Sequence, residues 1–233
     1  MAGCSETGCG VCPTDPARGW LAALLLCAMI SMVWSELDLA AARLFFRAGD
    51  GFFLKDLGLF RFIHKTMPWI LIGGAVIAVL CGAVAAWRKR PLWGMTGRKA
   101  AYLAASLALG PGLVVNSLLK EHWGRARPSQ IVDFGGIAQF TPAWRLTDQC
   151  AHNCAFSSGH AALGFWLVAV ALLAPARWRG GAVGAAFGWG LVVGVARMAQ
   201  GGHFLSDVVV SAAVTIVLSR WLFRRLVDRP ATD

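Results

Sequence analysis

Long runs of apolar residues dominate this chain and restrict what it can fold into. Six stretches approach the roughly 20 residues that a helix needs to cross a bilayer, and they cover residues 19–35, 68–87, 101–119, 156–174, 181–198 and 204–223. Only 15% of the 233 residues are charged and 57% are hydrophobic, whereas soluble domains carry about 25% charged residues. For the chain as a whole, these values exclude a soluble globular enzyme, a disordered tail and a disulfide scaffold. The sequence predicts an all-α polytopic membrane protein, a bundle of six transmembrane helices.

The positive charge of the chain follows the apolar stretches. The net charge is +10, and clusters such as residues 88–90, 98–99 and 224–225 lie beside spans. This is the pattern of topology signals and lipid-headgroup contacts, so we expect bilayer lipids and no nucleic acid as partners. With six spans both termini share one side, which carries twelve of the 22 Lys and Arg residues. We therefore expect both termini in the cytoplasm.

The chain shows no internal repeat and no linker, which predicts one membrane domain over residues 18–226. Residues 1–17 are expected to be a disordered cytoplasmic tail, and residues 227–233 a second cytoplasmic tail. Segment 40–66 interleaves phenylalanines with Lys and Arg, as interfacial helices on the external side do. Two interpretations stay open for it, a connecting loop anchored by aromatic side chains or a lip that guides a lipid substrate.

The cysteines fall into separate groups. Cys4, Cys9 and Cys12 superficially resemble part of an iron–sulfur pattern, but a fourth ligand is missing, so no metal site is expected there. Cys150 and Cys154 lie four residues apart in a predicted external loop. An oxidising compartment favours a disulfide between them over free thiols, and so short a ring would add local rigidity rather than global stability.

Polar residues gather at the external ends of four predicted helices. They are Lys120 and Arg127 after the third span, Ser158, Gly159 and His160 at the start of the fourth, Arg197 at the end of the fifth, and His203 and Asp207 at the start of the sixth. Each group alone has an ordinary explanation as a juxtamembrane charge, a helix cap or a structural hydrogen bond. Their joint placement on one face of the membrane favours a single site.

Five of these residues suit an anion. Lys120, Arg127 and Arg197 offer three positive charges, two of them planar guanidinium forks that match phosphate oxygens. Ser158 and Gly159 stand where a helix begins, so free backbone N–H groups can receive an anion. Glycine also lets the backbone approach closely. These residues predict a phosphate-binding site built from cations rather than a metal.

The remaining three residues supply reactive groups. His203 and Asp207 are four residues apart, which places both on one face of a helix. A carboxylate there can fix the imidazole tautomer and raise its basicity, as for a nucleophile. His160 is then free to protonate a leaving oxygen. Together these groups predict phosphoryl transfer through a phosphohistidine.

The order and spacing of these groups resemble the three-part signature of the type 2 phosphatidic acid phosphatase superfamily. The matching parts are Lys120-x6-Arg127-Pro128, Ser158-Gly159-His160 and Arg197-x5-His203-x3-Asp207. The resemblance implies a six-helix membrane phosphatase that needs no cofactor or metal and acts on a lipid phosphate. It implies His203 as the nucleophile, Asp207 as its partner and His160 as the general acid, with the other five residues binding phosphate. Ser157 and Ala196 depart from the usual Pro and Ser of the family, and neither change removes a catalytic group.

A second resemblance is narrower. Residues 122–125, 134–136, Cys150 and 153–154 are similar to bacterial lipid A phosphatases. This implies removal of a 1- or 4′-phosphate from lipid A, in the bacterial inner membrane with the site facing the periplasm. Undecaprenyl diphosphate, phosphatidylglycerophosphate and phosphatidic acid stay open as substrates, as do a lipid phosphotransferase and a vanadate-dependent oxidase. A phospholipid-binding or transport protein is the non-enzymatic alternative, and the sequence does not indicate an oligomeric state.

Overall fold

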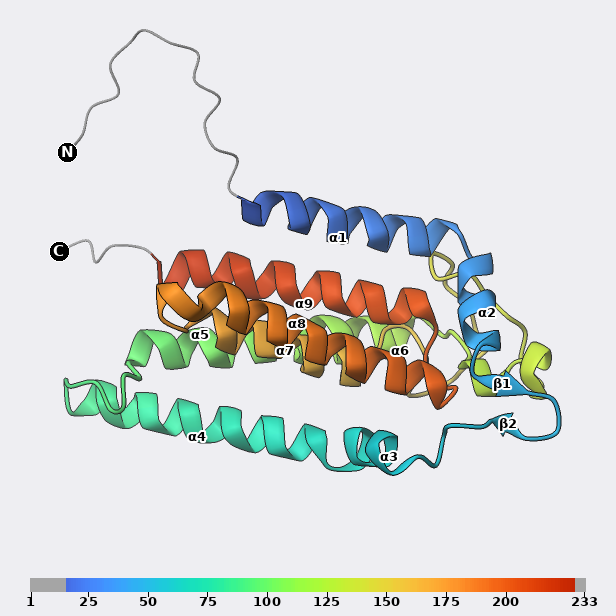
Figure 1. The fold of residues 1–233 in the computed structure, drawn as a ribbon, viewed down its shortest axis with the longest axis horizontal. Helices are drawn as coiled ribbons and strands as arrows, with labels where there is room; N and C mark the ends of the chain where they lie inside the picture. The colour runs from blue at the N-terminus through green and yellow to red at the C-terminus, as the bar shows by residue number, and fades with distance from the viewer. Residues whose placement is uncertain (1–15, 229–233) are drawn as a thin grey trace, which may run out of the picture.

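Long helices run alongside one another and nearly parallel to the long axis of the molecule (Figure 1). The computed structural model describes residues 16–228. The long helices are α1 (Pro16–Val33), α4 (Met67–Trp87), α5 (Gly97–Leu107), α7 (Gly159–Leu172), α8 (Ala176–Ala199) and α9 (Leu205–Leu226). Shorter elements are α2 (Glu36–Arg43), β1 (Phe46–Arg47), β2 (Gly51–Phe52), α3 (Gly58–Lys65), α6 (Lys120–His122) and two 3-10 turns (Pro128–Gln130 and Val132–Phe134). The fold is all-α apart from the small β1–β2 hairpin.

Four helices in the described part of the chain are long and apolar enough to cross a membrane on their own. They are Met67–Trp87, Gly97–His122, Ala176–Ala199 and Leu205–Leu226. A fifth span arises if α1 and α2 count together, although they meet at an angle of 92°. The fourth predicted span, 156–174, contains only the 14 residues of α7, because Ser158 caps the helix and Pro175 follows its end. The structure thus has four to five spanning helices by length and composition.

The span from Gly97 to His122 accommodates a proline without breaking. Between α5 and α6 the backbone forms a π-helical segment, Ala108–Leu119, that contains Pro111. Proline has no N–H to donate, and π-helical turns interrupt regular α-helix at such places. The Asn116 side-chain amide donates to the Pro111 carbonyl at 2.7 Å. The span therefore continues to Lys120, which stands at its end.

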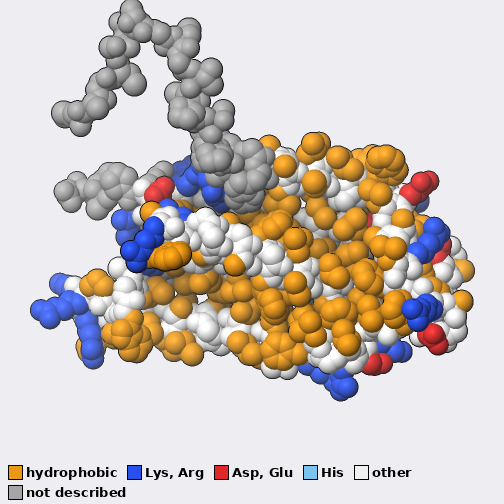
Figure 2. All heavy atoms as spheres, in the orientation of Figure 1, with side chains coloured by type: hydrophobic (Ala, Val, Ile, Leu, Met, Phe, Trp, Pro, Cys, Tyr) orange, Lys and Arg blue, Asp and Glu red, His pale blue; other side chains and the backbone are white. Residues whose placement is uncertain are grey.

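Helix α7 is the centre of the bundle and packs against both α8 and α9. Phe165 and Trp166 of α7 are buried together with Tyr102 of α5 and Ile216 of α9. A Cβ on Gly190 of α8 would lie 2.2 Å from the Phe165 ring, so this glycine allows the two helices to approach. Figure 2 shows hydrophobic side chains over most of the visible face, with charged side chains gathered toward its two ends. This distribution suits a bundle surrounded by lipid.

One end of the bundle holds the predicted site. The end of α6, the start of α7, the end of α8 and the start of α9 all meet there, together with α2, the hairpin and α3 (Figure 1). The aromatic segment 40–66 contains the end of α2, the hairpin and α3. Phe46 and Phe52 pack against Phe134, with ring centroids 5.1 and 5.5 Å away, so part of this aromatic set points inward. Cys4, Cys9 and Cys12 lie outside the described residues.

Candidate active site

His203 lies in the loop between α8 and α9, and only 1% of its surface is exposed. Its Nδ1 is 2.7 Å from the carbonyl oxygen of Ala155. Because a carbonyl only accepts, Nδ1 carries the proton and Nε2 keeps its lone pair. Within the described chain no hydrogen-bond partner contacts this buried Nε2. Burial is the main cause that lowers the pKa of His203 to about 4, with Arg197 and Lys120 adding to it and Asp207 opposing it.

Asp207, the predicted partner of His203, lies in the first turn of α9. Its Oδ1 accepts from Arg125 Nη1 at 2.6 Å, and its Oδ2 accepts from the Phe204 N–H at 2.7 Å. The distance from Oδ2 to His203 Nδ1 is 3.7 Å, which is too long for a hydrogen bond. The prediction that both residues share a helix face is wrong, because α9 begins at Leu205. Asp207 acts on the imidazole as a nearby charge, and Ala155 fixes the tautomer.

Ser158 and Gly159 stand at the start of α7, as the sequence predicts. Ser158 is the N-cap, and its hydroxyl accepts from the Ala161 N–H at 3.4 Å. A Cβ on Gly159 would lie 2.4 Å from Asn116 Oδ1, so glycine allows this close approach without displacing Asn116. The first turn of a helix presents N–H groups and the positive end of the helix dipole. This turn is therefore suited to receive an anion.

The three predicted cations converge on the same place. Lys120 and Arg197 are 9% and 3% exposed, and the charges of Arg127 and Arg197 both act on Lys120. Arg197 donates through Nη1 to Gln200 Oε1, whereas its buried Nε meets no partner in the described chain. A Cβ on Gly202 would lie 2.6 Å from Arg197 Nη2. The positive charges of Arg197 and Lys120 act on the loop histidine, whose buried Nε2 has no partner in the described chain.

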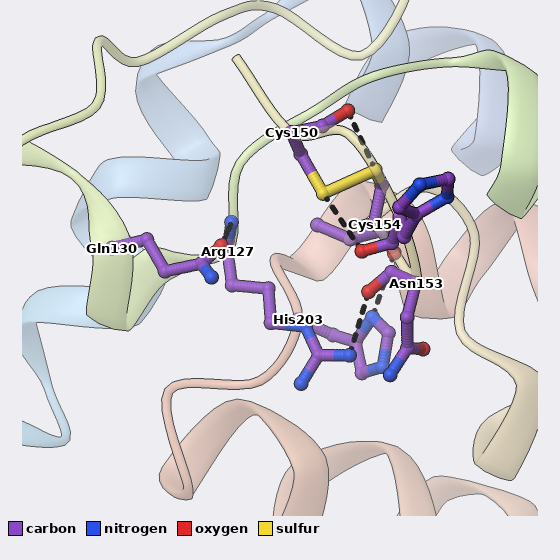
Figure 3. The surroundings of a disulfide bond; sticks show 8 residues. Arg127, Gln130, Cys150, Asn153, Cys154 and His203 are labelled. Carbon is purple, nitrogen blue, oxygen red and sulfur yellow. Dashed lines mark hydrogen bonds between the residues drawn. A yellow bond between two sulfur atoms is a disulfide. The ribbon is translucent and has the colours of Figure 1, made fainter.

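A disulfide joins Cys150 and Cys154 in the loop before α7. Two backbone carbonyl groups of this loop accept hydrogen bonds from site residues, one inside the disulfide ring (Asn153) and one just after it (Ala155). The Asn153 carbonyl accepts from Arg127 Nη2 at 2.7 Å, and the Ala155 carbonyl accepts from the loop histidine. In Figure 3 the Arg127 side chain extends from its own loop toward Asn153 and the imidazole, below the disulfide. The disulfide-bonded loop is therefore part of the site.

His160, the predicted general acid, is the second residue of α7. Its Nε2 lies 3.1 Å from the carbonyl oxygen of His64 in α3, and the two rings meet edge to face at 5.0 Å. Burial lowers the pKa of His64, and the charges of Arg197 and Arg127 lower it further. Both histidines thus face the cations. In residues 16–228, no three His, Cys, Asp or Glu side chains group as metal ligands.

Sequence reasoning missed two buried charges at the site. Neither Arg125 nor Asp38 is among the predicted site residues, yet Arg125 Nη2 donates to Asp38 Oδ2 at 2.7 Å. The available signal was an acidic residue between Leu37 and Leu39 in an apolar stretch, since charges in such places are expensive unless paired. The sequence does not indicate that the backbone carbonyls of Ala155 and His64 bind site histidines, because every residue carries the same carbonyl group.

Comparisons with known proteins agree with this geometry. Residues 99–230 match the PAP2 superfamily. The chain is 37% identical over 192 residues to the lipid A 4′-phosphatase of Francisella tularensis subsp. novicida, covering 82% of each chain. It is 34% identical over 179 residues to a lipid A 4′-phosphatase of Rhizobium etli, covering 72% of this chain and 66% of that one. No solved structure matches.

The family match and the curated relatives make this bundle of apolar helices a membrane lipid phosphatase. The family match covers the residues that form this site, from Lys120 to Asp207. The chain belongs to the PAP2 superfamily.

Proposed function

We propose that this protein removes the 4′-phosphate of lipid A through a phosphohistidine on His203. The observation that carries the chemistry is the imidazole geometry. Nδ1–H is bound to the Ala155 carbonyl, so the lone pair on Nε2 is free, and the positive charges of Arg197 and Lys120 act on the ring. A neutral, buried imidazole beside positive charge is an activated nucleophile for a phosphate dianion.

The reaction proceeds in two balanced steps. The Nε2 lone pair of His203 attacks phosphorus, and the bond from phosphorus to the sugar oxygen breaks. His160 protonates the departing oxygen. Its Nε2–H donates to the His64 carbonyl, so the acid is the imidazolium form of His160, and the proton that it gives up is the one on Nδ1. Neutral His160 then takes a proton from water, which attacks the phosphohistidine and releases inorganic phosphate.

The phosphate oxygens are bound by Lys120, Arg127, Arg197 and the first turn of α7. These groups stabilise the negative charge of the transferring phosphoryl group. Three cations supply the charge that a metal would supply in other phosphatases, so we propose a metal-independent reaction. Asp207 stabilises the positive charge that the His203 ring acquires when its Nε2 becomes phosphorylated.

The choice of lipid A and of its 4′-position rests on the relatives. Three curated relatives carry the name lipid A 4′-phosphatase, and the first covers 82% of this chain. At the site end of the bundle, α3 exposes Leu59 and Phe62 while it buries Ile63. This arrangement suits a helix in the headgroup region. We propose that α2, the hairpin and α3 form the lip across which the lipid enters.

We propose the bacterial inner membrane as the location, with the site facing the periplasm. The end opposite the site carries the basic residues 88–90 after α4, 98–99 in the first turn of α5, and 224–225 of α9. Such an excess marks the cytoplasmic side. Helix α7 has 14 residues, about 21 Å of length. With α1 it completes a six-span arrangement in which both termini are cytoplasmic.

Phosphate release by the purified protein in detergent, with EDTA present, tests this proposal. The lipids offered are lipid A, undecaprenyl diphosphate, phosphatidylglycerophosphate and phosphatidic acid, and tandem mass spectrometry locates the phosphate that lipid A loses. Loss of the 4′-phosphate by wild type and not by His203→Ala is the expected result. The control is Arg88→Ala, which removes an exposed side chain at the opposite end of the bundle and keeps its activity. Release from another lipid alone, or activity that requires added Mg²⁺, would contradict the proposal.

A further inference from the structure

Arg125 is a fully buried arginine that cannot serve the substrate. Its side chain is 0% exposed. Nε donates to the Thr141 carbonyl at 2.9 Å, Nη1 to Asp207 Oδ1 at 2.6 Å and to Ser206 Oγ at 2.9 Å, and Nη2 to Asp38 Oδ2 at 2.7 Å. A guanidinium has five N–H donors, and four are bound to protein here. This cation therefore differs from those of the phosphate site.

Asp38 binds the start of α9, although it lies outside the part of the sequence that matches the family. It belongs to α2, whereas the PAP2 match begins at residue 99. Its Oδ1 accepts from the Ser206 backbone N–H at 2.8 Å, and its Oδ2 accepts from the Ser206 hydroxyl at 2.6 Å. N–H groups in the first turn of a helix need an outside acceptor when buried. Asp38 supplies it with a carboxylate that is 1% exposed.

The main chain of Arg125 reaches the histidine by a second path. The Ala155 N–H donates to the Arg125 carbonyl at 2.8 Å, and the Ala155 carbonyl accepts the Nδ1 proton of His203 at 2.7 Å. The side chain of Arg125 meanwhile holds Asp207, whose Oδ2 lies 3.7 Å from the same Nδ1. Arg125 thus holds in place both groups near His203 Nδ1, the Ala155 carbonyl through its main chain and the Asp207 carboxylate through its side chain.

The charges of this cluster explain why two carboxylates are needed. Arg125 alone would neutralise Asp207, so the ring would face no net charge. With Asp38 added, the guanidinium is shared and the cluster of three side chains carries one net negative charge beside the imidazole. A phosphorylated imidazole is a cation, and a buried negative charge stabilises it in a low dielectric. The same hydrogen bonds hold Asp207 Oδ1 away from the ring.

We propose that Asp38 and Arg125 are positioning residues for the nucleophile, and that Asp38 makes α2 a part of the catalytic unit. This inference rests on the proposed role of His203. It predicts that loss of the Asp38 charge slows phosphorylation of the enzyme and leaves lipid binding intact. A purely structural ion pair between α2 and α9 would instead change stability, with equal kcat in the folded fraction.

The test compares Asp38→Asn with wild type, using lipid A in mixed detergent micelles. The Asn side chain has the same shape without the charge. We expect kcat, and the single-turnover rate of enzyme phosphorylation, to fall at least tenfold while KM stays within about twofold. The matched control is Glu36→Gln, which removes an exposed carboxylate from the same helix and leaves kcat unchanged. Thermal unfolding is followed for each variant.

Ser206→Ala keeps the charges and removes the hydroxyl that bridges Asp38 and Arg125. We expect it to lower kcat about threefold at unchanged KM, and it decides the matter if Asp38→Asn does not fold. Wild-type kcat in a folded variant would overturn the inference, as would a raised KM at unchanged kcat. If wild type itself forms no phosphoenzyme, the proposed function fails and the inference with it. If wild type forms one and the variants match its rate, only the inference fails.

Discussion

Removing the disulfide tests how the loop before α7 holds the site. In the double variant Cys150→Ser/Cys154→Ser the ring opens, and the bridge spans only four positions of sequence. Closing so short a loop contributes about 2 kcal/mol to stability in the chain-entropy account. The loss of stability should therefore be modest, and thermal unfolding in detergent should show a folded protein with a lowered midpoint.

Activity should fall more than this stability change suggests. The Asn153 carbonyl binds Arg127 and the Ala155 carbonyl binds His203, each at 2.7 Å. A hydrogen bond to a charged group is worth about 1.5 kcal/mol or more, which is about tenfold in rate. We expect kcat/KM for lipid A to drop about tenfold. Serine at the free cysteine Cys81, far from the loop in sequence, is the control and should match wild type. A double variant within twofold of wild type would refute the reasoning.

Three further outcomes follow from the site. Because the pKa of His203 is lowered from 6.5 to about 4, the unfolded chain binds more protons there between these values, and this contribution to stability falls as pH falls. The thermal unfolding midpoint of wild type should thus fall further than that of His203→Gln between pH 7 and pH 4.5. An equal fall would contradict the lowered pKa of His203. Gly159→Ala places a Cβ 2.4 Å from Asn116 Oδ1. Phosphate-release assays should show kcat at least tenfold lower, and the free energy of unfolding should fall by about 1–3 kcal/mol. Gly188→Ala, with open space around it, should behave as wild type. Arg197→Lys keeps the charge without the planar fork, and initial-rate kinetics should show KM for lipid A raised about tenfold; an unchanged KM would exclude Arg197 from phosphate binding.

The positions of the site residues were predictable because helix ends leave signals. Ser158 caps α7, Arg197 lies in the last turn of α8, and Asp207 lies in the first turn of α9. Apolar runs fix where helices lie, and polar residues at their ends fix where they stop. Four of the six predicted spans correspond to helices of spanning length. The predicted span 156–174 falls short because the cap at Ser158 shortens α7, and α1 counts as a span together with α2, across a sharp bend.

The connections within the site could not be predicted from the sequence. Asp38 and Arg125 are separated by 87 positions, and their pairing depends on how α2 folds back over the bundle end. The partner of His203 Nδ1 is the backbone carbonyl of Ala155. Because every residue has a backbone carbonyl, the sequence does not indicate which one binds the histidine. The i,i+4 spacing of His203 and Asp207 suggested a direct hydrogen bond, but the helix starts between them. Spacing rules apply only inside a helix.

Rapid quenching of a single turnover tests the central claim most directly. Purified protein is mixed with lipid A that carries a radioactive 4′-phosphate, stopped in alkali and digested for mass spectrometry. The account predicts a phosphate bound to the peptide that contains His203, stable in alkali and labile in acid, and its absence in His203→Ala. Release of labelled phosphate by wild type with no labelled peptide, or with the label on another residue, would contradict a phosphohistidine at His203.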